Sequence, residues 1–260
     1  AGVSRLLNRP LAILIQGPSS SGKSHVLRAV AQLFPPEAIF SATTLSTLSL
    51  YYAKAGTFRH RFVVCGERSR RTDDDQAEVT RALREMLSEG RLKRLVTVKK
   101  NDGPPIAELV EQEGPIAYAE STTLATSDIL VEDLNRMVLL ATDETPGQTK
   151  AVLYQVAQKY ERGPRGDAKR ITEKHHAAQR LLRPMPVQIP YATALVELLP
   201  STRLEVRRGA GYILAMVEAS ALLHQYQRHE TGNGELIATL DDYRLARTLL
   251  AQPLGRLLGR

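Results

Sequence analysis

Eight consecutive residues near the start of the chain have the composition of a phosphate-binding loop. Gly17 and Gly22 bracket a small polar stretch, and Lys23 and Ser24 complete the order G-x-x-x-x-G-K-S. Glycines let the backbone curl so that successive N–H groups point at phosphate oxygens. The lysine of such a loop reaches the β- and γ-phosphates of a nucleotide, and the serine hydroxyl binds Mg²⁺. The sequence therefore predicts binding of ATP with Mg²⁺ by Gly17, Pro18, Ser19, Ser20, Ser21, Gly22, Lys23, Ser24 and His25.

The segments on either side of this loop are those that it requires. Residues 11–16 form an apolar run that is too short for a helix and typical of a buried strand. Residues 25–33 place Val26, Val30 and Leu33 at helical spacing. The loop then lies at a helix N-terminus, whose partial positive charge favours phosphate. The alternative interpretation is a chance turn rich in glycine and serine.

A second apolar strand is predicted at residues 62–65, and it leads to Gly66 and Glu67. Ligands of open α/β sheets bind at the carboxyl ends of the strands, so Glu67 is the candidate to orient or deprotonate an attacking water. Most hydrolases of this kind carry an Asp directly before the Glu, and this chain has Gly66 there. Either Mg²⁺ relies on Ser24, phosphates and water, or Glu67 serves the metal and hydrolysis is slow. A solvated glutamate at a strand end is the third possibility.

A third apolar strand, residues 115–120, leads into Ser121, Thr122 and Thr123. A hydroxyl at this position can sense the γ-phosphate, and Thr122 is the candidate, although the same residues also make an ordinary turn. Further on, Arg136 directly precedes another strand-like run, residues 137–141. Ring-forming ATPases carry an arginine finger at such a place.

The order of these segments resembles the core of an AAA+ ATPase. The late segment 206–228 is similar to the lid helix of the minichromosome-maintenance-like branch. Over roughly residues 10–250 the chain resembles the ATPase region of primase–helicase-like proteins of phages and integrative elements. Beside the loop, the phrases that carry the resemblance are GERS at 66–69, EGPI at 113–116, ESTT at 120–123, EDLNR at 132–136, DE at 143–144 with QT at 148–149, and LHQYQR at 223–228.

The resemblance implies an α/β fold, in which helices flank a parallel sheet and a small α-helical lid domain follows. The expected domains are an ATPase core at residues 1–162 and a helical lid at residues 163–260. The resemblance also implies that Arg136 acts on the nucleotide of a neighbouring subunit, and that Arg207 or Arg208 is the lid arginine known as sensor 2. The implied assembly is a homo-oligomer, most simply a hexameric ring.

Two groups of basic residues are candidates for contact with DNA. Arg68, Arg70 and Arg71 follow Glu67, and a solvated loop balanced by the acidic residues 73–75 is the competing interpretation. Lys99 and Lys100 follow a predicted strand at 95–98, and the resemblance implies an inserted hairpin with lysines that line a pore. A lysine-tipped turn in solvent is the alternative.

Composition limits the classes of protein that remain. The chain has 260 residues, a formal net charge of +7, 43% hydrophobic residues and one cysteine, Cys65. One cysteine excludes an internal disulfide framework and a cysteine-based zinc cluster. No apolar run approaches the ~20 residues that cross a bilayer, so a cytoplasmic protein without membrane partners is expected. The usual DNA-reading modules of the family are absent, which leaves loops or partner proteins to hold DNA.

The leading hypothesis is an oligomeric ATPase that couples hydrolysis to work on DNA, as a helicase or another ATPase of replication or mobile elements. Its expected partners are copies of itself, DNA, and primase or other replication proteins. A non-hydrolysing, nucleotide-dependent DNA-binding or assembly module is the alternative, and Gly66 favours it. A small-molecule kinase with a phosphate loop is the third hypothesis.

Overall fold

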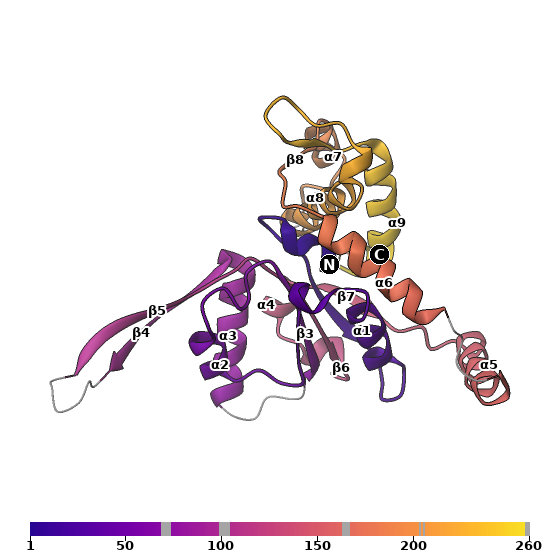
Figure 1. Ribbon diagram of the computed structural model, residues 1–260, viewed down its shortest axis with the longest axis horizontal. Coiled ribbons are helices and arrows are strands. Elements are labelled where there is room, and N and C mark those ends of the chain that lie inside the picture. The colour runs from indigo at the N-terminus through magenta and orange to yellow at the C-terminus, as the bar shows by residue number, and fades with distance from the viewer. Residues whose placement is uncertain (69–73, 99–104, 163–166, 203, 205, 258–260) are drawn as a thin grey trace.

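The computed structural model describes residues 1–68, 74–98, 105–162, 167–202, 204 and 206–257. Its centre is a parallel sheet of five strands in the order β2-β3-β6-β1-β7 (Figure 1). The bounds of these strands, in chain order, are β1 Ala12–Gln16, β2 Ile39–Ala42, β3 Arg61–Arg68, β6 Ile116–Thr122 and β7 Val138–Ala141. The three strands predicted at 11–16, 62–65 and 115–120 are thus confirmed, and they are adjacent in the sheet.

Helices cover both faces of this sheet because both faces are apolar. Along β3, Phe62 and Val64 pack with Leu27 of α1 (Lys23–Ala31), whereas Val63 and Cys65 pack with Met86 of α3 (Asp74–Glu89). Such alternation within one apolar run is typical of a parallel strand that is buried on both sides. The short helices α2 (Thr47–Tyr52) and α4 (Val131–Leu134) lie on the α3 side of the sheet. The predicted α/β fold with a flanked parallel sheet is therefore confirmed.

A β-hairpin projects from the core beside α3 (Figure 1). Its strands are β4 (Arg91–Val98) and β5 (Ile106–Glu113), which pair antiparallel from Arg91↔Glu113 to Val98↔Ile106. The strand predicted at 95–98 is the distal half of β4, and no strand was predicted for β5. Lys99 and Lys100 come between β4 and β5 in the sequence, within residues 99–104, which lie outside the described residues.

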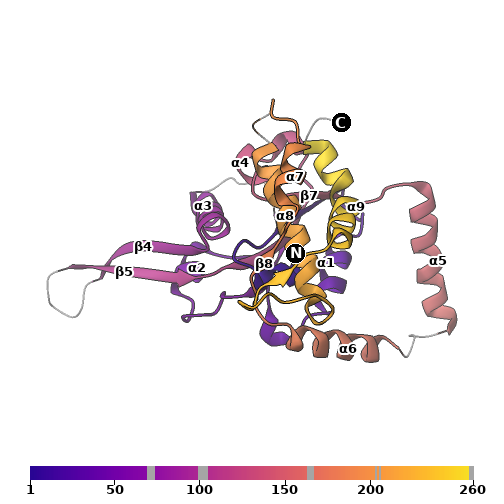
Figure 2. The ribbon, with the colours of Figure 1, turned by 90° about the horizontal axis from the view of Figure 1, so that it is seen from above.

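After β7 the chain leaves the core in α5 (Pro146–Arg162) and returns through α6 (Ala168–Leu181). Figure 2 shows α5 standing apart from the core, and its apolar side chains Val152, Leu153, Val156 and Tyr160 are exposed. Helix α6 rejoins the core by polar contacts, such as the Arg180–Glu37 ion pair of 2.6 Å. The predicted boundary between residues 162 and 163 borders residues 163–166, which the structure does not describe.

The last part of the chain is mainly helical and packs at the starting ends of the strands. Its elements are β8 (Val187–Gln188), α7 (Ala192–Glu197), α8 (Val206–Leu223), β9 (Leu236–Ile237) and α9 (Leu240–Leu257). Leu11 precedes β1 and Val138 begins β7, and both pack against Ala215 of α8 and Leu250 of α9. These helices therefore lie at the edge of the sheet opposite to the phosphate loop, which follows the end of β1. None of the helices in the described part of the chain combines the length and the apolarity that a bilayer span requires.

Asp242 of α9 connects this helix to α8 through hydrogen bonds. Its carboxylate is fully buried and accepts hydrogen bonds from Ser220 of α8 (2.6 Å), Arg228 (2.7 and 2.9 Å) and the Thr239 backbone (2.9 Å). Burial alone would raise the pKa of Asp242, but these hydrogen bonds lower it to about 2. These contacts between the C-terminal helices therefore require the Asp242 carboxylate to be ionised.

We expect this region to lose stability in acid through Asp242. The pKa of an unfolded Asp is about 3.9, so the folded state releases this proton more readily, and the stabilisation is complete above about pH 5. It is lost as the pH falls from about 5 to 1, and it amounts to about 2–3 kcal/mol. Denaturant unfolding at pH 5 and pH 2.5 should show a smaller pH dependence for Asp242→Asn than for wild type. Asp241→Asn, which changes an exposed neighbour, should match wild type. Equal pH dependence in all three proteins would contradict the assignment.

Candidate functional site

The phosphate loop connects β1 to α1 by a tight backbone path. Ser20 has a φ of 68° and Gly22 a φ of 90°, both in the left-handed region. A side chain at Gly17 would place its Cβ 2.0 Å from Thr142 Oγ1, so only glycine fits where the loop leaves the sheet. The Gly17 amide donates to the Thr122 carbonyl at 3.2 Å. The loop is thus anchored to the neighbouring strand β6 at its first residue.

Lys23 is drawn into the loop. Its side chain is buried, and Nζ donates to the carbonyl oxygens of Gly17 (2.8 Å) and Pro18 (2.7 Å). The ammonium group therefore lies inside the curl of the loop, where the phosphates of a nucleotide are bound in this motif. Most of the other predicted phosphate-loop residues are accessible to a ligand: Pro18, Ser19, Ser20, Gly22, Ser24 and His25 are exposed.

A cavity of about 330 Å³ adjoins the loop, between α1 and the ends of β2, β3 and β6. Ser24, Thr43, Gly66 and Ser121 line it. Ser121 is fully buried, and its Oγ has no hydrogen-bond partner among the described residues. Ser21 Oγ, within the loop, is buried in the same unsatisfied way in the described structure. Buried hydroxyls are normally paired, so two orphaned ones around the loop fit a site that binds a polar ligand such as nucleotide phosphate.

A β-bulge in β3 decides where Glu67 lies. Val64 pairs with Ala119 of β6, but Glu67 pairs with Ser121, so β3 contains one residue more than its partner over this stretch. Without the extra residue, simple alternation would put Glu67 on the α3 face, with Val63 and Cys65. The bulge instead brings Glu67 beside Ser121, on the face that α1 covers. Bulges are common next to active sites because they re-aim a side chain in this way.

Gly66 occupies the bulge because the backbone is crowded there. Its amide donates to the Thr43 carbonyl at 3.2 Å, and a Cβ on Gly66 would lie 2.6 Å from that same oxygen. An Asp, which most hydrolases of this kind have at this position, would therefore collide with the end of β2. The bulge that positions the exposed Glu67 therefore requires a glycine at residue 66.

The residues present fit Mg²⁺ bound with a nucleotide. In the described part of the chain, no group of three or more His, Cys, Asp or Glu side chains is placed to hold a metal ion. Mg²⁺ usually keeps several waters and takes only one or two protein ligands together with substrate phosphates. Ser24, exposed at the start of α1 and lining the cavity, suits that role. Glu67 is paired in the sheet with Ser121, which also lines the cavity.

The structure corrects the prediction for Thr122. Its side chain is fully buried on the α3 face, where Oγ1 donates to the Arg68 carbonyl (3.2 Å) and accepts from the Leu124 amide (3.1 Å). The hydroxyl is thus used within the fold and does not face the loop. Ser121, its neighbour, has the position that was predicted for Thr122. Adjacent strand residues face opposite sides of the sheet, and the sequence alone did not indicate which of the two faces α1.

The structure also corrects the prediction for Arg68. Its side chain is only 6% exposed, and its guanidinium forms ion pairs with Glu120 of β6 and Asp133 of α4. Arg84 of α3 joins the network, since its Nε donates to Asp133 at 2.6 Å. Burial opposes ionisation, but the two carboxylates raise the pKa of Arg68 above its ordinary value. Arg68 therefore joins β3, β6 and α4 inside the protein and cannot reach DNA.

The other predicted arginines lie away from the loop of their own chain. Arg136 lies two residues before the start of β7, and its side chain donates to Ser88 Oγ (2.9 Å) and to the Glu132 carbonyl (2.8 Å). Because β7 runs parallel to β1, this is the edge of the sheet opposite to the phosphate loop. Arg207 and Arg208 are exposed at the start of α8, and the charges of Arg208 and Arg136 both act on Tyr212. These arginines form a second group, apart from Lys23, Ser24 and Glu67. Arg70 and Arg71 lie outside the described residues.

Comparison with known proteins agrees with the loop and the sheet. A model of the MTBMA_p00010 P-loop domain family matches residues 2–185, which include the loop, all five strands of the sheet and α5 and α6. A search among curated proteins finds no match to the chain. The match covers well over half of the chain, and a domain of this kind suggests nucleotide binding. The chain therefore belongs to the MTBMA_p00010 P-loop domain family.

Proposed function

We propose that the chain is an ATPase of the AAA+ type, which binds ATP with Mg²⁺ at the phosphate loop and hydrolyses it. The observation that carries the proposal is the bulge in β3, which puts Glu67 beside Ser121 at the edge where the loop ends. A strand that merely ended in a solvated glutamate would need neither the extra residue nor the crowded Gly66.

Each residue of this group has a distinct role in the proposal. The loop amides and Lys23 hold the β- and γ-phosphates, and the Ser24 hydroxyl is a ligand of the metal. Mg²⁺, when bound, neutralises charge on the phosphate oxygens. The Ser121 hydroxyl contacts the terminal phosphate, in the role first assigned to Thr122. Glu67 orients a water molecule and accepts its proton as the oxygen attacks.

The proposed assembly is a ring of identical subunits, most simply a hexamer. Arg136 and Arg208 lie at the edge opposite to the phosphate loop, so they cannot serve the nucleotide of their own chain. A head-to-tail interface brings that edge of one subunit to the loop of the next, and repeated interfaces of this kind close into rings. Arg136 then acts as the arginine finger, and Arg207 or Arg208 as the lid arginine, both on the neighbour's nucleotide.

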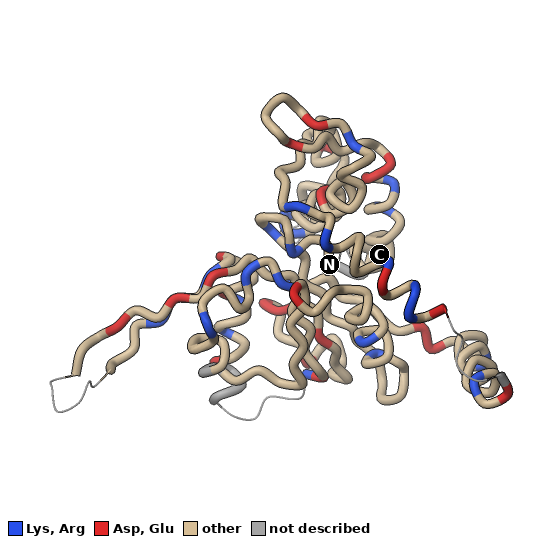
Figure 3. The backbone as a smooth tube through the Cα atoms, viewed as in Figure 1, with Lys and Arg blue, Asp and Glu red and all other residues tan. Residues whose placement is uncertain are grey.

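We further propose that the ATPase acts on DNA, as a helicase or another ATPase of replication or mobile elements. Primase is a proposed additional partner. The support for action on DNA is the hairpin β4–β5, which extends well beyond the core (Figure 1) and ends in the segment that contains Lys99 and Lys100. Among the described residues, charge distribution alone does not indicate a path for DNA, because basic and acidic segments are interleaved over the core, α6 and the C-terminal helices (Figure 3). Lys99 and Lys100 are therefore the proposed contacts.

A second candidate function is a nucleotide-dependent assembly or DNA-binding module without hydrolysis. Gly66 favours it, because the crowding by the Thr43 carbonyl excludes the Asp that would help to hold Mg²⁺. Turnover of ATP with and without single-stranded and duplex DNA, measured beside the mass of the complex with an ATP analogue, separates the candidates. DNA-stimulated turnover in a ring supports the first function. Assembly without turnover supports the second, and a monomer that phosphorylates an added acceptor contradicts both.

The shared site is tested by mixing two inactive variants. Lys23→Ala should bind ATP about 100-fold more weakly than wild type and stay inactive, and Arg136→Ala should bind ATP without turning it over. In a random 1:1 mixture, about one quarter of the interfaces join an intact loop to an intact Arg136, so about one quarter of the wild-type rate should return. Full turnover by Arg136→Ala alone, or a mixture that stays inactive although it assembles, contradicts the inter-subunit site.

A further inference from the structure

The segment before Arg136 is held from two sides. On the core side, Asp133 receives the ion pairs of Arg68 and Arg84, and its carbonyl accepts the Arg136 amide at 2.9 Å. On the other side lies α8 of the C-terminal region. The position of Arg136 therefore depends on how these two parts of the protein meet.

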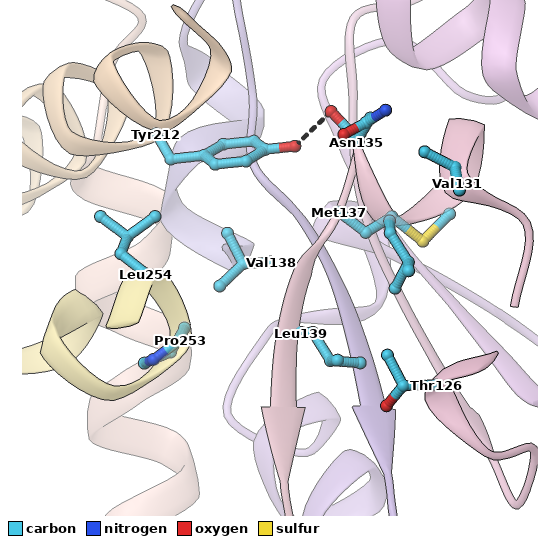
Figure 4. Close-up of a pocket in the computed structure, with 10 residues that line it drawn as sticks. Thr126, Val131, Asn135, Met137, Val138, Leu139, Tyr212, Pro253 and Leu254 are labelled. Atoms are coloured by element: carbon cyan, nitrogen blue, oxygen red, sulfur yellow. Dashed lines mark hydrogen bonds between the residues drawn. The ribbon is translucent and has the colours of Figure 1, made fainter. Parts of the chain in front are cut away.

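Tyr212 of α8 makes a direct polar link between them (Figure 4). Its hydroxyl donates to the carbonyl of Asn135 at 2.8 Å, one residue before Arg136. Burial raises the pKa of Tyr212 to about 12, so the hydroxyl keeps its proton at physiological pH. The charges of Arg208 and Arg136 both act against this rise in the pKa of Tyr212.

The side chains next to the Tyr212–Asn135 hydrogen bond are not closely packed. A cavity of about 240 Å³ lies between β7, α4 and the end of α9, and Tyr212 forms part of its wall. Apolar side chains line most of it, among them Val131, Met137, Val138 and Leu254 (Figure 4). Apolar contacts across a cavity are incomplete and have no direction, whereas the hydrogen bond of Tyr212 fixes the distance and orientation of one backbone carbonyl.

We propose that Tyr212 is the positioning residue of Arg136: its hydrogen bond to Asn135 holds the arginine at the subunit edge and transmits movement of α8 to it. This inference rests on the proposed function, in which Arg136 serves the neighbour's nucleotide. Arg208, one turn earlier on α8, moves with the same helix, so the two arginines change place together. The C-terminal helices thereby control how the trans arginine is presented.

Tyr212→Phe in the full chain tests the link, because it removes one hydroxyl and keeps the ring. Tyr191→Phe is the matched control, since that tyrosine also lies in the C-terminal region and donates to a backbone carbonyl, of Thr239 at 2.5 Å. Amide hydrogen exchange of peptides covering residues 131–137 should be faster in Tyr212→Phe and unchanged in Tyr191→Phe. This measurement needs no enzymatic turnover. Unchanged exchange in Tyr212→Phe overturns the proposal.

Kinetics test the consequence for Arg136. Tyr212→Phe should lower kcat by about five- to tenfold, the loss expected for one hydrogen bond that positions a catalytic group, and KM for ATP should stay within about twofold. An unchanged kcat in the active protein overturns the proposal. Absence of turnover in wild type contradicts the proposed function instead, and the exchange measurement then decides whether Tyr212 anchors the segment.

Discussion

Replacing Glu67 by glutamine is expected to abolish most ATP hydrolysis while leaving ATP binding intact. Glutamine keeps the size of the side chain but cannot take a proton from water, and general-base catalysis contributes about 10²–10⁴-fold to a rate. Because Glu67 is exposed near the end of β3, and β6 lies between β3 and the strand that leads to the loop, its loss should not disturb Lys23 or the fold. Phosphate release should therefore fall at least about 100-fold, and the affinity for ATP should change by less than about twofold.

Glu144→Gln is the matched control for this experiment. Glu144 is a second exposed carboxylate that follows a strand of the same sheet, β7, at the same edge as the loop. It should turn over ATP like wild type. If Glu67→Gln keeps its rate and Glu144→Gln loses it, the catalytic base has been assigned to the wrong strand.

Replacing Arg68 by methionine is expected to destabilise the core by about 3–5 kcal/mol, the usual cost of removing one partner from a buried ion pair. The change leaves the buried carboxylates of Glu120 and Asp133 without the guanidinium that faces both of them. Denaturant unfolding at pH 7 measures this loss. Arg59→Met is the matched control, because Arg59 pairs with Glu113 in solvent at 3.2 Å and exposed pairs contribute at most about 1 kcal/mol.

The pH dependence of Arg68→Met checks the cause of the loss. Burial opposes ionisation of Asp133, but Arg84 and Arg68 lower its pKa below the ordinary value. The stabilisation by this pair is therefore present above the pKa of an unfolded Asp and disappears as the pH falls below it. The difference between wild type and Arg68→Met should shrink in acid. A difference that is small at pH 7, or that grows in acid, contradicts the buried network.

Much of the nucleotide-binding half could be predicted from the sequence. Strands buried on both faces are short apolar runs, and residues 11–16, 62–65 and 115–120 stand out because polar segments interrupt them. The phosphate loop carries its own signature of glycines, lysine and serine. Strand β5 escaped prediction for the opposite reason, since it belongs to a projecting hairpin and most of its side chains are exposed.

The details of the site could not be predicted, because they depend on register. A period of two decides whether Ser121 or Thr122 faces the loop, and one bulged residue moves Glu67 from one face to the other. Neither the facing of the β6 residues nor the bulge in β3 can be recognised from the residue types alone. The same bulge directs Arg68 inward to two carboxylates that lie 52 and 65 residues further along the chain. Its place beside other arginines in the sequence had favoured a DNA contact instead.

Direct titration of ATP in the presence of Mg²⁺ is the measurement that bears most directly on the central claim, that this chain binds nucleotide at the phosphate loop. Wild type should bind ATP, and Lys23→Ala should bind it about 100-fold more weakly, since a loss of about 3 kcal/mol is expected where a charged donor to phosphate is removed. Lys174→Ala, which removes an equal charge from the exposed surface of α6, should bind like wild type. Equal affinity in wild type and Lys23→Ala, or no binding by wild type, would contradict the account.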